Sequence, residues 1–276
     1  MEESSFSVNY DKISRVYDSS RAANTETVNN LITLLRINSS SLVLDVGCGT
    51  GNYGSILNWI AGSVIGLDSS IGMITRASVK FPELLLINGA VTHLPLKPDI
   101  FDGLFSIQVL HHVENKALFF SEAYRVLKNG SWMAVDSASH KQLETFWVYH
   151  YFSEGLNIDK ARIPDTRQIV EFMQVTGFVN VGIVTSYTNV EIHHKNPERY
   201  LEKEFRDGQS TFHLMTEEEI EIGCNKLRRD VASGEINSIV QEFERKEREV
   251  GGSSIIYGQK LSTSITASTG YESLAS

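Results

Sequence analysis

The chain has 276 residues, of which 41% are hydrophobic and 21% charged, a composition that predicts a globular protein and excludes a disordered one. Its formal net charge of −9 disfavours a nucleic-acid partner, because an acidic surface repels phosphate backbones. Two cysteines, Cys48 and Cys224, exclude a disulfide framework and a four-thiolate metal site. We expect a cytoplasmic protein without a membrane segment, because the first residues are acidic and polar and no apolar run approaches ~20 residues.

The first half of the chain alternates between helical and strand patterns. Residues 28–35 are apolar at helical spacing and predict an amphipathic helix. Short apolar runs predict strands at 41–46, 63–68, 84–88, 101–108 and 132–135, and the segments between them predict helices at 52–61, 70–81 and 115–128. Asn129 and Gly130 are expected to cap the last of these helices. Such alternation predicts an α/β, doubly wound fold, in which ligands bind at the carboxyl ends of parallel strands.

The pattern changes beyond residue 140. Residues 140–163 are aromatic and irregular, and the run 146–152 either encloses an apolar substrate or packs a core. A helix at 166–176, a strand at 178–187, a charged helical stretch at 195–250 and a last strand at 253–257 are expected to follow. His193 and His194 are adjacent, and adjacent residues on a strand point to opposite faces, so the two side chains cannot bind one metal ion together. We expect both to lie on the surface and expect no metal site.

A glycine-rich turn directly follows the first predicted strand. Gly47, Gly49 and Gly51 permit a sharp turn and a close approach of a ligand to the backbone. Asp68 ends the next strand, 19 residues beyond Gly49, where a carboxylate accepts hydrogen bonds from ribose hydroxyls. The simpler alternative for Asp68 is an N-cap of the following helix. Turn and acid together predict a nucleoside-binding site.

The spacing of the turn leaves two nucleoside cofactors to compare, NAD(P) and S-adenosylmethionine. The dinucleotide fingerprint is G-x-G-x-x-G, whereas this turn reads G-x-G-x-G, and we take Tyr53 to occupy the place of the third glycine. Asp45 precedes the turn by two residues, and a carboxylate there repels a pyrophosphate. It suits a ligand with an ammonium and a sulfonium group, which favours S-adenosylmethionine.

Five sequence blocks in this order resemble the class I S-adenosylmethionine-dependent methyltransferases, in particular the small-molecule branch that includes the ubiquinone and menaquinone biosynthesis enzymes. The blocks are 44–51, 66–73, 89–96, 101–113 and 122–130. The resemblance implies a Rossmann-like, mostly parallel, seven-stranded sheet, with an antiparallel last strand, and S-adenosylmethionine as the cofactor that becomes S-adenosylhomocysteine. The cofactor-binding residues that it implies are Tyr17, Arg21, Asp45, Gly47, Gly49, Asp68, Ser69, Met73, Ala90, Val91, Ser106 and Gln108.

Two parts of the resemblance carry their own expectations. The third block usually holds an Asp that accepts from the adenine amino group, and here that residue is Ala90. The backbone around Ala90 and Val91 would then hold the adenine, with weaker cofactor binding but not its loss. The segment 10–21 resembles a helix that precedes this domain in the family, in which Tyr17 and Arg21 reach the cofactor, Arg21 as a bidentate donor. The alternative is a surface helix.

Methyl transfer by in-line displacement requires an aligned nucleophile, and a base wherever that nucleophile carries a proton. The catalytic candidates are His112, His111 and Tyr10. His112 ranks first because it follows the fourth strand, and its alternative is a structural role in that turn. Tyr149, His150 and Tyr151 are rival bases or pocket walls.

The predicted organisation is an N-terminal helical lid at 1–40, an S-adenosylmethionine-binding core at 41–187, a helical insertion that caps the substrate at 188–252, the last strand at 253–261 and a tail at 262–276. The predicted function is methyl transfer to an O, N or C atom of a small molecule; the sequence does not define the acceptor or the oligomeric state. The alternatives are a nucleic-acid or protein methyltransferase, an NAD(P)-dependent oxidoreductase and a non-catalytic S-adenosylmethionine-binding protein. Residues 106–109 lack the proline of adenine-methylating enzymes, which disfavours a nucleic-acid substrate.

Overall fold

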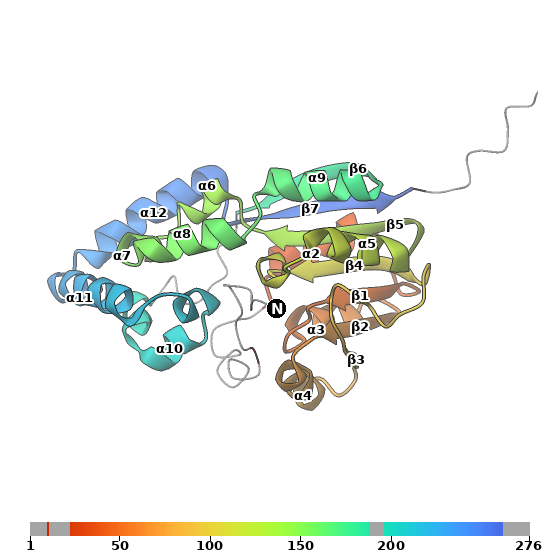
Figure 1. Ribbon diagram of the computed structural model, residues 1–276, viewed down its shortest axis with the longest axis horizontal. Coiled ribbons are helices and arrows are strands. Elements are labelled where there is room, and N and C mark those ends of the chain that lie inside the picture. The colour runs from red at the N-terminus through yellow and green to blue at the C-terminus, as the bar shows by residue number, and fades with distance from the viewer. Residues whose placement is uncertain (1–9, 11–22, 188–195, 262–276) are drawn as a thin grey trace, which may run out of the picture.

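The computed structural model describes residue 10 and residues 23–187 and 196–261, which form a sheet-containing lobe and a helical lobe (Figure 1). The strands are β1 (Leu42–Val46), β2 (Ser63–Asp68), β3 (Leu85–Asn88), β4 (Phe101–Ile107), β5 (Leu127–Ser137), β6 (Phe178–Ser186) and β7 (Ser253–Lys260). They make a seven-stranded sheet in the order β3-β2-β1-β4-β5-β7-β6. Pairing is parallel from β3 to β5, and β7 lies antiparallel between β5 and β6. The predicted fold class and the antiparallel last strand are confirmed.

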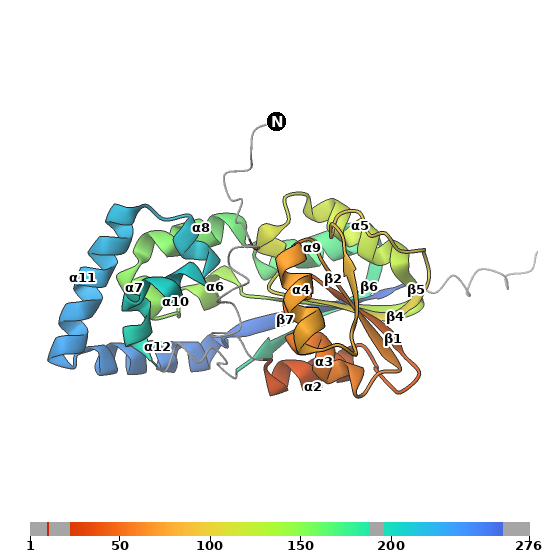
Figure 2. The same ribbon diagram turned by 90° about the horizontal axis from the view of Figure 1, so that it is seen from below.

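Helices cover both faces of the sheet (Figure 2). Helices α2 (Thr25–Leu34) and α3 (Asn52–Asn58) pack on one face, where Leu31 and Leu57 are fully buried against β1 and β4. Helices α5 (Lys116–Val126) and α9 (Thr166–Thr176) pack on the other, through Phe120 and Met173. Helix α4 (Ile71–Lys80) lies beside β2 and β3. Because the central strands are buried on both sides, they are apolar at nearly every position, as β1 is.

The boundary between α5 and β5 differs from the sequence expectation. The helix ends at Val126, and Leu127 is already extended and pairs with Phe101. Gly130 has φ +83° but lies inside β5, where the pairing register with β4 shifts, so it serves a bulge instead of a helix cap. The predicted C-cap at Asn129 and Gly130 was therefore wrong.

The helical lobe combines two stretches of sequence. The first holds α6 (His140–Leu143), α7 (Val148–Tyr151) and α8 (Ser153–Arg162). The second holds η3 (Pro197–Leu201), α10 (Lys203–Asp207), η4 (Ser210–His213), α11 (Glu217–Ser233) and α12 (Ile236–Val250). Both share one apolar core that includes Trp147, Phe152, Tyr200 and Leu227. Residues 140–163 are thus helical, not irregular, and the cap over the sheet is larger than the expected insertion.

Residues 24–35, which the expected lid included, pack against the sheet as part of its covering layer through α2. Of the preceding residues the structure describes only Ala23 and Tyr10. Within the described ranges no helix is long and apolar enough to cross a bilayer, and no three metal-ligating side chains gather at one point.

Candidate active site

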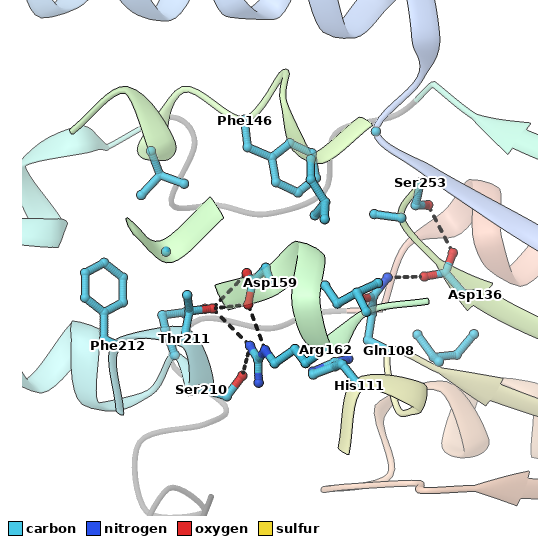
Figure 3. Close-up of a pocket in the computed structure, with 18 of the residues that line it drawn as sticks. Gln108, His111, Asp136, Phe146, Asp159, Arg162, Ser210, Thr211, Phe212 and Ser253 are labelled. Carbon is cyan, nitrogen blue, oxygen red and sulfur yellow. Dashed lines mark hydrogen bonds and ion pairs between the residues drawn. The ribbon is translucent and has the colours of Figure 1, made fainter. Parts of the chain in front are cut away.

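A cavity of about 240 Å³ lies between the two lobes. The carboxyl ends of β1, β4 and β5 form one wall, with Asp45, Gln108 and Asp136. The helical lobe forms the other wall, which includes Arg162 and Phe212 (Figure 3). This is the edge of a doubly wound sheet at which ligands bind.

The glycine turn has a geometry that only glycine accepts at its first position. Gly47 has φ +78°, and a Cβ there would lie 2.4 Å from the side chain of Val109. The N–H groups of Gly47 and Cys48 both donate to the carbonyl of Leu67, at 2.7 and 3.0 Å. These bonds tie the turn to the end of β2, and so place it beside Asp68.

Asp68 holds the turn with both carboxylate oxygens. One accepts from the N–H of Gly49 at 2.9 Å and the other from the N–H of Ser70 at 2.8 Å. The N-cap of α4 is Ser70, whose hydroxyl accepts from the N–H of Met73, so the N-cap alternative for Asp68 was wrong. A carboxylate is a hydrogen-bond acceptor only, which suits ribose hydroxyls as donors.

Asp45 is a buried acid at the start of the turn, with 3% of its surface exposed. Burial raises its pKa well above the usual value, the nearby charge of Asp68 raises it further, and a hydrogen bond from the N–H of Gly54 opposes both. Two carboxylates at one turn favour a cationic ligand over a pyrophosphate. The spacing argument against NAD(P) was wrong, because Gly49, Gly51 and Gly54 also read G-x-G-x-x-G.

Gln108 connects the ends of three strands. Its φ is +53°, and its side-chain amide donates to Asp136 at 2.6 Å. The hydroxyl of Ser253, at the start of β7, donates to the other oxygen of Asp136 at 3.0 Å. Sequence reasoning missed Asp136 and Ser253. An acid at the carboxyl end of a predicted strand, as with Asp45 and Asp68, was the available signal for Asp136.

The two histidines of the η1 turn (Leu110–His112) have different surroundings. His111 lines the cavity. The Nε2 atom of His112 is hydrogen-bonded to the hydroxyl of Tyr10, and the two rings meet edge to face at 4.7 Å. The structure thus brings all three catalytic candidates together, but His111, the second choice, is the one on the cavity wall.

The three rival bases, Tyr149, His150 and Tyr151, contact other side chains of the helical lobe. Tyr149 lines the cavity, but its hydroxyl donates to Asp159, and burial raises its pKa well above the usual value, which keeps it protonated. Tyr151 donates to Asp230 on α11, and His150 packs against Phe243 on α12. The aromatic run therefore both packs a core and lines the cavity.

The other predicted cofactor residues are placed as follows. Ser106 is fully buried, and its hydroxyl donates to the carbonyl of Val46, so it supports the turn from behind. Met73 is 1% exposed, beneath the start of α4. Ser69 and Ala90 are exposed, and Val91 packs against the core under α5. Tyr17, Arg21, His193 and His194 lie outside the described residues.

Comparison with known proteins identifies the class. Residues 44–135 match the family described as a methyltransferase domain. A protein of Mycolicibacterium smegmatis named "Probable S-adenosylmethionine-dependent methyltransferase" is 28% identical over 49% of this chain and 51% of its own length. Demethylmenaquinone methyltransferase of Lactiplantibacillus plantarum is 33% identical over 40% of this chain and 56% of its own length. The chain thus spans about half the length of these relatives.

A solved structure from Anabaena variabilis has the same fold. It is described as belonging to an antibiotic biosynthesis pathway, is 24% identical, and aligns with a TM-score of 0.73 over 86% of this chain and 98% of its own. The doubly wound sheet with its glycine turn and paired acids therefore defines a nucleoside-binding α/β protein. Within that class, residues 44–135 carry a methyltransferase domain, and the relatives together support the class I S-adenosylmethionine-dependent methyltransferase family, with S-adenosylmethionine as the cofactor.

Proposed function

We propose that this protein transfers a methyl group from S-adenosylmethionine to a small organic molecule. One observation carries the proposal: a single cavity joins the glycine turn and Asp45 to an aromatic wall in the helical lobe. A cofactor end and an acceptor end in one cavity are what an in-line displacement requires, because the two reactants must be held in alignment.

The residues at the cofactor end fit S-adenosylmethionine. Asp68 offers oxygens to the ribose. Burial raises the pKa of Asp45, and a cationic ligand beside it would stabilise the charged form of this carboxyl. When bound, S-adenosylmethionine supplies a methyl group on a sulfonium, a good leaving group. The roles of Ser69, Met73, Ala90, Val91 and Gln108 as further cofactor contacts stay predictions, as do those of Tyr17 and Arg21.

His111 is the group that we assign to proton removal from the acceptor. It lies on the cavity wall at the exit of β4, between the cofactor end and the helical lobe (Figure 3). Histidine accepts a proton near neutral pH. His112 and Tyr10, hydrogen-bonded to each other, stand behind it, with the His111 and His112 ring centroids 3.8 Å apart. This pair would orient His111.

The acceptor is proposed to be a small, largely apolar molecule. Phe146, Phe152, Phe212 and Met215 line the lobe side of the cavity. Demethylmenaquinone, the acceptor in the name of the L. plantarum relative, is of this apolar kind. The net charge of −9 agrees with a non-nucleic-acid substrate.

Calorimetric titration of the purified protein with S-adenosylmethionine, S-adenosylhomocysteine and NADH tests the cofactor part. We expect the two sulfur nucleosides to bind and NADH not to bind. Release of S-adenosylhomocysteine is then followed with a panel of hydroquinones and aromatic ketones as acceptors. Binding of NADH alone would overturn the proposal. Cofactor binding without turnover on any acceptor would favour the non-catalytic alternative.

A further inference from the structure

A buried polar cluster lies on the helical-lobe wall of the cavity, apart from the glycine turn. Asp159 and Arg162 are three residues apart on α8, and their side chains are only 5% and 3% exposed. The guanidinium Nε donates to one oxygen of Asp159 at 2.8 Å. An ion pair this deeply buried is costly unless its remaining donors and acceptors are also engaged.

Neighbouring side chains engage most of them and fix the orientation of the pair (Figure 3). Asp159 accepts from the hydroxyls of Tyr149 and Thr211. The Nη2 atom of Arg162 donates to Ser210 at 2.9 Å and to Thr211 at 3.1 Å. Four side chains from α7, α8 and η4 thus hold the guanidinium in one position.

Two hydrogen-bond donors on this wall of the cavity lack an acceptor among the described residues. The Nη1 atom of Arg162 and the Nε2 atom of Gln209 are buried and have no hydrogen-bond partner among the residues that the structure describes. Both residues line the cavity. Gln209 directly precedes Ser210, to which Arg162 donates. Buried donors in native proteins are nearly always satisfied, so these two exceptions on the wall of one cavity indicate the position of a ligand atom.

The charges around the cavity restrict which kind of ligand atom can accept from these two donors. Of the described lining residues, Arg162 alone is an arginine or lysine, and four are acids: Asp45, Asp136, Asp159 and Glu247. Asp159 already neutralises Arg162. A carboxylate or phosphate would therefore add a negative charge beside acids, without a free counter-charge. A neutral oxygen accepts both N–H groups without that cost.

We infer that Arg162 and Gln209 bind a neutral carbonyl oxygen of the methyl acceptor, and so select an apolar or aromatic ketone, ester, amide or quinone against the corresponding acid. The aromatic wall of Phe146, Phe152 and Phe212 would hold the apolar body of that molecule. This inference rests on the proposed function, because it takes the lobe side of the cavity as the acceptor site.

Three matched probes test it on the full-length protein saturated with S-adenosylhomocysteine. They are acetylnaphthalene, ethylnaphthalene and naphthoate, which share a ring system and differ in the neutral carbonyl and the charge. Calorimetry should show acetylnaphthalene binding at least about tenfold more tightly than either of the others, the effect of one good hydrogen bond.

Variants then locate the effect. Gln209→Leu removes one donor and leaves the ion pair intact. Arg162→Lys keeps a charge beside Asp159 but loses Nη1 together with the Nη2 bonds to Ser210 and Thr211. Each should reduce the preference for acetylnaphthalene at least about threefold, and Gln209→Leu is the more specific test because it removes a single donor. Gln174→Leu, on the exposed side of α9, is the matched control and should change nothing.

The outcomes separate this inference from the proposed function. Failure of S-adenosylhomocysteine to bind removes the proposed function. If it binds, then equal affinity for acetylnaphthalene and ethylnaphthalene, tighter binding of naphthoate, or no binding of any probe overturns the inference alone. An unchanged preference for acetylnaphthalene in Gln209→Leu and Arg162→Lys also overturns the inference and leaves the proposed function standing.

Discussion

Asp68 has two functions at once, and they can be separated by substitution. Asp68→Asn keeps an acceptor for the N–H of Gly49 or Ser70 but loses the charge and one acceptor. We expect calorimetry to show affinity for S-adenosylmethionine at least about tenfold lower, with the fold kept, because charged hydrogen bonds to the ribose are lost. Asp68→Ala should abolish detectable binding and also lower the melting temperature.

The exposed, ion-paired Asp207 supplies the control, since Asp207→Asn should leave cofactor affinity unchanged. Near wild-type affinity in Asp68→Asn and Asp68→Ala would remove Asp68 from the ribose site.

Burial of the Asp45 carboxyl lowers the stability of the ligand-free protein at neutral pH. Its pKa is raised in the folded state, so the folded state binds a proton more tightly than the unfolded state does. The free energy of unfolding therefore falls as pH rises from the usual value of 3.8 towards the raised value, and the penalty is complete above it.

Asp45→Asn should consequently raise the melting temperature of the ligand-free protein at pH 7, and that gain should vanish below a pH of about 3.8. The same variant should bind S-adenosylmethionine more weakly. Thermal unfolding followed by circular dichroism across this pH range measures the first effect, and calorimetry the second. A loss of stability at pH 7 would show that Asp45 is a structural acid.

The two histidines of the η1 turn predict different losses of rate. His111→Gln should slow turnover by roughly 10²–10⁴, the usual contribution of a general base, with cofactor affinity largely kept. His112→Gln loses the hydrogen bond with Tyr10 and should have a smaller effect, shared by Tyr10→Phe. S-adenosylhomocysteine release with the acceptor found in the panel provides the measurement. Greater damage from His112→Gln than from His111→Gln would reverse the assignment.

At the scale of elements, the packing of α11 on α7 depends on one glycine. A Cβ on Gly223 would lie 2.4 Å from the ring of Phe152 and 2.8 Å from the carbonyl oxygen of Tyr151. A ring can turn, but a backbone carbonyl cannot move without its helix. Gly223→Ala should therefore destabilise the protein by about 1–3 kcal/mol, despite the better helix propensity of alanine.

Chemical denaturation measures this loss, and Arg229→Ala, on the exposed side of the same helix, provides the comparison. Loss of acceptor binding in Gly223→Ala, with cofactor binding kept, would also be expected, because Phe152 lines the cavity. Equal stability of Gly223→Ala and the wild type would show that α7 and α11 are not held rigidly together.

Helices and strands whose apolar residues recur at a clear period were predictable from sequence, and the other elements were not. Strand 63–68 and helix 166–176 have the predicted bounds, because β-branched runs and apolar residues at helical spacing end at strong signals such as Gly177. Helices α6 to α8 were missed, because α6 and α7 span a single turn each and α8 buries Gly155, Asp159 and Arg162, so none of them has an apolar stripe at helical spacing.

The same distinction applies to the site. Gly47, Asp45 and Asp68 are placed by contacts within the single unit of β1, α3 and β2, so local sequence was sufficient to find them. Arg162 meets Ser210 and Thr211 only when two distant segments pack together. In the sequence, Asp159 and Arg162 have the spacing of an ordinary surface ion pair, and nothing local indicates that they are buried.

At the scale of the whole molecule, the net charge predicts that this protein does not bind nucleic acid. With a net charge of −9, binding to duplex DNA or to transfer RNA should be undetectable at physiological salt in a mobility-shift assay. Added cofactor should not change this. A retained complex that weakens steeply with rising salt would instead indicate a local basic surface and revive the nucleic-acid alternative.

The position of β7 joins the two lobes in a further way. This strand follows α12 in the chain yet lies between β5 and β6, so both of those strands keep an unpaired edge until residues 253–260 arrive. The second stretch of the helical lobe, which ends with α12, is thus the connection that leads into the strand completing the sheet. During folding, misplacement of the lobe would leave two hydrogen-bonding edges open to other chains. A substitution in the helices that line the cavity can therefore affect both the cavity and the tendency to aggregate.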